Sequence, residues 1–76
     1  MNDISNENCI KAYFDFGEYD LFERNENGLW NHEHWGRNGI WEYEEKDWED
    51  ENVLEVLNNF PTKTVFGYGV EWWAKI

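Results

Sequence analysis

Two Asn-Gly dipeptides, Asn27-Gly28 and Asn38-Gly39, limit the folds open to this 76-residue chain more than any other feature. Both residue types tolerate the positive φ angles of the tight turns that join antiparallel strands. Each dipeptide lies between segments that are typical of strands. The stretch from Tyr19 to Lys46 is therefore predicted to form two consecutive hairpins, which make a three-stranded antiparallel meander.

Loop length decides which side chains of the meander share a face, because opposite residues and residues two apart lie on the same side of a sheet. With two-residue loops, the first hairpin pairs Glu23 with His32 and the second pairs His32 with Glu45, while a one-residue bulge would invert part of this arrangement. The mostly aromatic and apolar face, assigned to the core, holds Tyr19, Leu21, Glu23, Trp30, His32, His34, Trp41, Tyr43 and Glu45. The mostly charged face, assigned to solvent, holds Asp20, Phe22, Arg24, Asn31, Glu33, Trp35, Glu42, Glu44 and Lys46.

Two further strands are predicted outside the meander. Apolar and polar residues alternate from Ile10 to Phe16, which predicts a half-buried strand that ends at Gly17. Residues 64–76 are rich in β-branched and aromatic residues and predict a long closing strand, with glycines that permit a bulge or bend.

One short helix is predicted over residues 48–59. An acidic cluster precedes it, as is typical of helix N-termini, and Pro61 follows its end. Its apolar stripe holds Val53, Leu54, Leu57 and Phe60. The predicted fold class is therefore α+β, a small antiparallel sheet of about five strands in the order β-β-β-β-α-β with one short helix packed on one face.

The chain is predicted to form one domain, residues 1–76, with a polar and frayed start over residues 1–8. A chain this short buries only about 60% of the surface that its unfolded form exposes, which leaves room for one core. Its 20% aromatic content contradicts the composition of disordered chains. Cys9 is the single cysteine, and no apolar run approaches the roughly 20 residues that cross a bilayer, so we expect a soluble protein in a reducing cytoplasm.

The charge balance indicates the kind of partner. Asp and Glu number 17 against 6 Lys and Arg, so the net charge is −11. This charge repels phosphate backbones and anionic lipids, which makes a basic protein the expected partner and argues against direct binding of nucleic acid or membranes. The alternative is that the acidity only keeps a small protein in solution.

Acidic residues of the solvent face and of the helix start, with two aromatic anchors, form the predicted partner-binding site. Aromatic side chains ringed by charge are typical of interfaces, because strand positions that face only water seldom use them. If both faces of the sheet are covered, these two side chains belong to a core instead. The predicted site holds Glu33, Glu42, Glu44, Asp47, Glu49, Asp50, Glu51, Phe22 and Trp35.

His32 and His34 permit a second interpretation, because two imidazoles on one strand face can bind zinc or copper with Glu23 or Glu45 as a third ligand. No Cys-x-x-Cys and no further histidine completes such a site. A histidine bonded to one of these two glutamates is therefore favoured, and no metal or cofactor is predicted. The chain also has no phosphate-binding loop or nucleophile elbow, and its only serine is Ser5, so no catalytic role is predicted.

A short, acidic, aromatic-rich chain without catalytic motifs resembles the small phage-encoded inhibitors of bacterial defence, including anti-CRISPR proteins and DNA mimics. The resemblance is one of size, charge and composition, and it implies neither a fold nor particular site residues. It implies a non-catalytic inhibitor that occupies a basic nucleic-acid channel of a defence enzyme in the cytoplasm of a bacterial host. Two alternatives stay open: an immunity protein that neutralises a basic nuclease toxin, and a metal- or small-ligand-binding module that uses His32 and His34.

Overall fold

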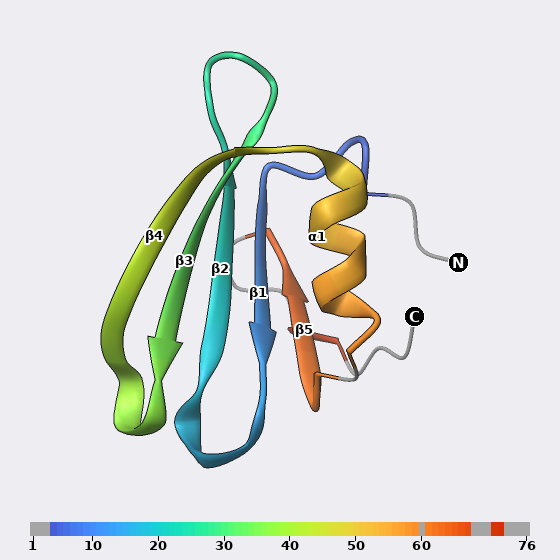
Figure 1. The fold of residues 1–76 in the computed structure, drawn as a ribbon. Helices are drawn as coiled ribbons and strands as arrows, with labels where there is room; N and C mark the ends of the chain where they lie inside the picture. The colour runs from blue at the N-terminus through green and yellow to red at the C-terminus, as the bar shows by residue number, and fades with distance from the viewer. Residues whose placement is uncertain (1–3, 60, 68–70, 73–76) are drawn as a thin grey trace.

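The computed structural model describes residues 4–59, 61–67 and 71–72, which form one antiparallel sheet with a single helix, α1 (Asp50–Leu57), on one face (Figure 1). The predicted α+β class, with one antiparallel sheet and one short helix, is confirmed. The strands are β1 (Cys9–Tyr13), β2 (Tyr19–Arg24), β3 (Trp30–Gly36), β4 (Ile40–Trp48), β5 (Lys63–Phe66) and the two-residue β6 (Glu71–Trp72). Their order across the sheet is β4-β3-β2-β1-β5-β6, so α1 carries the chain from the edge strand β4 back to the free side of β1.

The first hairpin turns where Asn27-Gly28 predicts a turn, but with a longer loop. Gly28 has a φ of 76°, whereas Asn27 has no positive φ, and the Gly28 N–H donates to the Asn25 carbonyl at 3.0 Å. This is a type I turn followed by a left-handed glycine, the usual three-residue hairpin loop. Arg24 therefore pairs with Trp30 and Phe22 with His32, one residue away from the predicted register.

This shift turns β2 over and overturns the predicted faces of that strand. Asp20 and Phe22 are buried on the face that α1 covers, called here the inner face, and Phe22 is fully buried. Leu21 and Glu23 move to the opposite, outer face of the sheet. Phe22 is thus a core residue, and its prediction as an exposed anchor is wrong.

The second hairpin keeps most of the predicted register. Asn38 and Gly39 both have positive φ, as a tight turn requires, and His34 pairs with Tyr43 and His32 with Glu45 as predicted. A register shift lies between His34 and Trp35. It places Trp41, predicted in the core, opposite Trp35 with 51% of its surface exposed.

Three predicted boundaries are corrected. The strand predicted to reach Gly17 ends at Tyr13, because residues 15–17 form a short turn in which Phe16 takes a φ of 64° and is 69% exposed. The helix spans Asp50–Leu57 instead of 48–59, and Phe60 lies outside the described residues. The predicted closing strand is two antiparallel strands, β5 and β6, while residues 68–70 and 73–76 lie outside the described residues.

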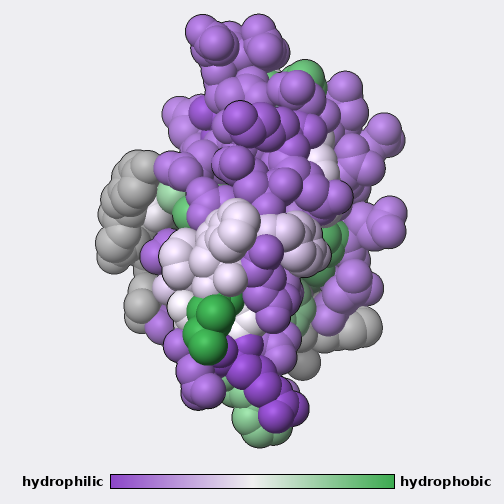
Figure 2. All heavy atoms as spheres, turned by 60° about the vertical axis from the view of Figure 1, so that its left-hand side comes forward, coloured by the Kyte–Doolittle hydropathy of each residue, from purple (hydrophilic) through white to green (hydrophobic). Residues whose placement is uncertain are grey.

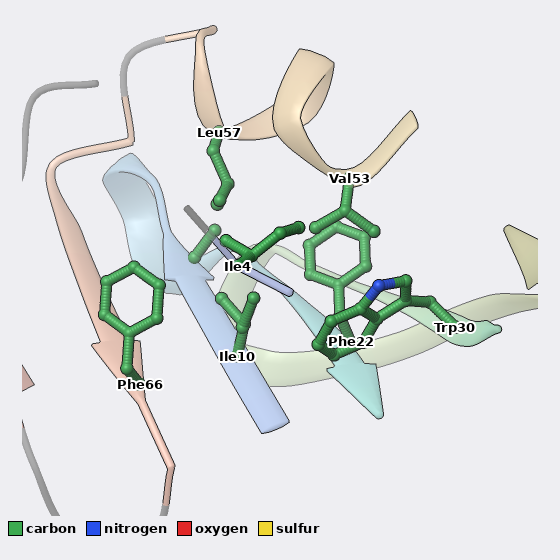
Figure 3. Packing of buried hydrophobic residues seen from close by; sticks show 8 residues of the cluster. Ile4, Ile10, Phe22, Trp30, Val53, Leu57 and Phe66 are labelled. Atoms are coloured by element: carbon green, nitrogen blue, oxygen red, sulfur yellow. The ribbon is translucent and has the colours of Figure 1, made fainter. Parts of the chain in front are cut away.

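The core lies between α1 and the inner face. Figure 3 shows Val53 and Leu57 pointing from the helix toward the sheet. Ile4, from the segment predicted to be frayed, is only 1% exposed and packs in the same cluster, so this residue belongs to the core. The buried cluster consists of Ile4, Ile10, Ala12, Phe22, Trp30, Val53, Leu57 and Phe66.

The short helix leaves part of the inner face uncovered. In Figure 1, α1 stands beside β1 and β5, whereas β3 and β4 curve away from it. All but the last residue of β4 are exposed. Among the described residues, no helix is both long and apolar enough to cross a membrane.

Candidate functional site

The predicted acidic residues lie along the edge strand β4 and the start of α1, where most of them face solvent. Figure 2, which brings the β4 side forward, shows a mostly hydrophilic surface with a smaller area of less polar side chains. The exposed acidic side chains of the predicted site are Glu42, Glu44, Asp47, Glu49 and Glu51. Glu33, on the neighbouring strand β3, is half-buried. The acidic edge, as the name is used below, consists of Glu33, Glu42, Glu44, Asp47 and Glu51.

Glu33 and Glu44 lie directly opposite each other on the outer face. Like charges in this position destabilise a strand pair. The Trp35 indole donates to the Glu33 carboxylate at 3.1 Å, but no basic side chain of the described residues pairs with either glutamate. Within the described part of the chain, these two carboxylates therefore lie side by side without a neutralising ion pair.

Two predicted binding residues stabilise the fold instead. Asp50 Oδ1 accepts hydrogen bonds from Trp30 Nε1 and Arg24 Nη1, both at 2.7 Å, and these bonds lower the pKa of Asp50. Glu49 accepts a hydrogen bond from the backbone of Asn52, and Asn52 Oδ1 accepts one from the Glu49 N–H, which is a capping box. Asp50 and Glu49 are thus committed to the start of α1.

Trp35 is half-buried in an aromatic row on the outer face. Its ring stacks on Tyr19 with centroids 5.5 Å apart, and Tyr19 contacts Tyr13 at the same centroid distance. The large exposed apolar side chains of the described part are Phe16, Ile40, Trp41 and Tyr43, none of which was predicted as an anchor. Phe16 is exposed on its turn, and the other three lie on the edge strand β4, where every residue but the last is exposed.

A chain of alternating carboxylates and imidazoles crosses the inner face beyond the helix. Asp20 Oδ1 lies 3.0 Å from His32 Nε2 and 2.6 Å from His34 Nδ1. The outer nitrogens then face glutamates, with His32 Nδ1 3.2 Å from Glu45 Oε1 and His34 Nε2 3.4 Å from Glu42 Oε1. The predicted contact between His32 and Glu45 is present, and Asp20 joins the two histidines.

His32 is the most buried member of this cluster. The side chain of His32 is 4% exposed, and its ring lies against both Phe22 and Trp48, with centroid distances of 4.8 and 4.3 Å. Burial by itself raises the pKa of Asp20, but the hydrogen bonds from His32 and His34 and the charges of these rings outweigh it. The pKa of Asp20 therefore lies below its ordinary value of 3.8.

The sequence signal for Asp20 lies in the turn. Asn25-Glu26-Asn27-Gly28 fits a type I turn that ends in a left-handed glycine, and the Asn25 side chain accepts a hydrogen bond from the Asn27 N–H at 2.9 Å. A three-residue loop pairs Asp20 with His34. The two-residue loop predicted from Asn27-Gly28 alone pairs Leu21 with His34 and places Asp20 on the solvent face.

Among the described residues, the structure provides no third ligand for a metal ion bound by His32 and His34. Within the described residues, no group of three or more His, Cys, Asp or Glu side chains is arranged to hold a metal ion. Each ring nitrogen of the two histidines already faces a carboxylate oxygen. The histidines are arranged around a buried carboxylate and leave no nitrogen turned to an open site.

A cavity of about 320 Å³ opens beside this cluster, between the sheet and the C-terminal part of α1. Its polar lining consists of Glu18, Asp20, His32, His34, Tyr43, Glu45 and Asn59. Phe14, Trp48 and Val56 supply apolar walls. The cavity therefore combines buried and partly exposed carboxylates with aromatic surface.

No protein-family model, curated protein or solved structure matches this chain.

Proposed function

We propose that the protein is a non-catalytic inhibitor that binds the basic, nucleic-acid-binding surface of a bacterial defence enzyme, in the manner of anti-CRISPR proteins and DNA mimics. The acidic edge is the binding surface. The observation that carries the proposal is the pair Glu33 and Glu44, two carboxylates held opposite each other without an ion pair to any basic side chain of the described residues. A partner's Lys or Arg between them would neutralise a repulsion that the free protein bears.

The spacing of charge along β4 supports mimicry of a phosphate backbone. An edge strand exposes side chains from both faces, and the acids of β4 and the α1 start follow one another at intervals of one or two residues. Each residue advances a strand by about 3.3 Å. Carboxylates two residues apart on one face are therefore about 6.6 Å apart. This is about twice the 3.4 Å or so between phosphates along the axis of one B-DNA strand, so the row approximates the spacing of alternate phosphates.

Charge-reversed variants test this proposal. Immobilised wild-type protein, Glu44→Lys/Glu51→Lys and the control Asp15→Lys/Glu26→Lys are each incubated with nuclease-treated bacterial lysate. Both variants change the net charge equally, and the control residues are exposed in loops outside β4 and α1. We expect wild type and control to retain nucleic-acid-binding proteins that short duplex DNA displaces, and the first variant to lose them.

The proposal is wrong if the β4 and α1 variant retains the same proteins as wild type. It is equally wrong if duplex DNA fails to displace the retained proteins, because a mimic and its model must compete for one surface.

A further inference from the structure

We propose that the cavity beside Asp20 receives the guanidinium group of an arginine side chain from the basic partner, with Asp20 as the innermost anion. This inference rests on the proposed function, which supplies a partner rich in arginine. It adds a specific binding pocket to a surface that otherwise recognises charge alone.

The charge balance of the cavity selects a cation. Glu18, Asp20 and Glu45 of the lining, with Glu42 beside His34, contribute four carboxylates. They stand against the two imidazoles of His32 and His34 and the Arg37 guanidinium, which lies 3.9 Å from Glu18. The sum stays negative even when both imidazoles are protonated. The pKa of Tyr43 is consistent with this negative potential. It is raised first by burial and then by the negative charges of Asp20 and Glu45.

Asp20 offers an acceptor that the fold does not use. Its side chain is 9% exposed, and both histidine contacts go to one oxygen, Oδ1. Oδ2 accepts no hydrogen bond from any residue that the structure describes, and it is not a fully buried atom. A ligand N–H can therefore reach Oδ2 and form a charge-assisted hydrogen bond with it.

The aromatic walls favour guanidinium over ammonium. Arg is planar, more weakly hydrated than Lys, and stacks on aromatic rings, and Trp48, Tyr43 and Phe14 line the cavity. A volume of about 320 Å³ is at the small end of ligand pockets, which span roughly 300–1,000 Å³, and suits one long side chain.

The protein already builds such a site for one of its own arginines. The Arg24 guanidinium lies 4.0 Å from the ring centroid of Trp30 and 2.7 Å from the Asp50 carboxylate. The cavity offers the same two elements, with Trp48 as the indole and Asp20 as the carboxylate. In contrast to the Arg24 site, it holds no cation from the described residues.

Nuclear magnetic resonance titration with a small probe tests the proposal on the intact protein. The probe is Nα-acetyl-arginine methylamide, and the matched probes are its neutral citrulline isostere and the corresponding lysine derivative. We expect the arginine probe to shift the Trp48 indole N–H signal saturably. The citrulline probe should bind at least about tenfold more weakly, because it lacks the charge that strengthens the hydrogen bond to Asp20.

Two glutamates provide the matched variants. Glu45→Gln removes a charge from the cavity, and Glu26→Gln removes the same charge from the exposed β2–β3 loop, outside the cavity and the acidic edge. We expect Glu45→Gln to weaken arginine binding at least about threefold and Glu26→Gln to leave it within twofold of wild type. Asp20→Asn should weaken it further, provided that its Trp48 signal shows a native fold.

The proposal is overturned if the arginine probe gives no saturable shift, if citrulline binds as tightly, or if the two glutamine variants weaken binding equally. Failure of this pocket is separable from failure of the inhibitor function. If the Glu44→Lys/Glu51→Lys variant loses its partners but the arginine probe does not bind, the protein binds through the acidic edge and not through the cavity.

Discussion

Arg24 joins three parts of the chain that are distant in sequence. Its guanidinium donates to the carbonyls of Ile4, Ser5 and Glu7, to Gly28 at the β2–β3 turn and to Asp50 at the start of α1. Its side chain is only 15% exposed, although the predicted register placed it in solvent. Arg24, which was predicted to face solvent, therefore links the start of the chain, the β2–β3 turn and the start of α1.

Replacing Arg24 is expected to weaken the whole fold. Arg24→Ala removes the hydrogen bonds to four backbone carbonyls and the ion pair with Asp50, so the free energy of unfolding should fall by about 3 kcal/mol. Arg37→Ala is the control, because Arg37 is 70% exposed and its ion pair with Glu18 spans 3.9 Å. Urea denaturation of both variants measures the difference, and equal losses would contradict the role given to Arg24.

The lowered pKa of Asp20 predicts that the protein loses stability in acid. Its folded-state pKa lies below the ordinary 3.8, so the native state binds this proton less readily than the unfolded state. The stabilisation is complete above about pH 4 and is lost as the pH falls through the folded-state pKa. Asp20→Asn should therefore flatten the fall in unfolding free energy in acid, whereas the exposed loop variant Asp15→Asn should keep the wild-type profile. Parallel profiles for wild type and Asp20→Asn would show that Asp20 is not the source.

At the scale of elements, α1 is stabilised mainly by packing and by its cap. Eight residues are too few for a helix to be stable in isolation. Val53 and Leu57 are both buried against the sheet, while the capping box of Glu49 and Asn52 satisfies backbone groups at the start. The helix therefore exists only on the sheet that it covers.

Leu57→Ala tests this dependence. Leu57 is 1% exposed in the core cluster, so truncation should lower the free energy of unfolding by about 2–4 kcal/mol. Glu55→Ala, on the exposed side of the same helix, should change it by less than about 0.5 kcal/mol. A melting temperature that Leu57→Ala leaves unchanged would show that α1 does not pack as described.

At the scale of the molecule, the acidic edge opposes stability while it serves binding. Glu44→Lys places an opposite charge beside Glu33, so it should raise the free energy of unfolding by about 0.5 kcal/mol and still weaken partner binding. Glu51→Lys should weaken binding too, but lower stability by about 0.5 kcal/mol, because it puts a positive charge in the first turn of α1. Calorimetry and binding measured together separate the two effects. A gain in binding with Glu44→Lys would rule out the acidic edge as the binding surface.

Salt should act in opposite directions on folding and on binding. The net charge of −11 repels itself in the compact state, so raising salt from about 0.02 to 0.5 M should raise the melting temperature. The same salt should slow association with a basic partner. Stopped-flow association rates that do not change with salt would contradict electrostatic recognition.

Local patterns were sufficient for the elements of this protein. Two Asn-Gly turns, the alternation from Ile10 and the stripe that includes Val53 and Leu57 predicted the antiparallel sheet and its helix, because turn chemistry and side-chain periodicity act within a few residues. The acidic stretch of β4 was equally visible, since charge is a property of composition.

The tertiary structure decided which side chains face each other. One extra residue in the loop before Gly28 turned β2 over, which buried Phe22 and Arg24 and brought Asp20 between His32 and His34. A strand has a side-chain period of two, so a shift of a single residue moves every side chain to the other face. The turn sequence Asn25-Glu26-Asn27-Gly28 accommodates the longer loop, and packing against α1 and the core favours the register that this loop gives. The cavity and its buried carboxylate exist only in that register.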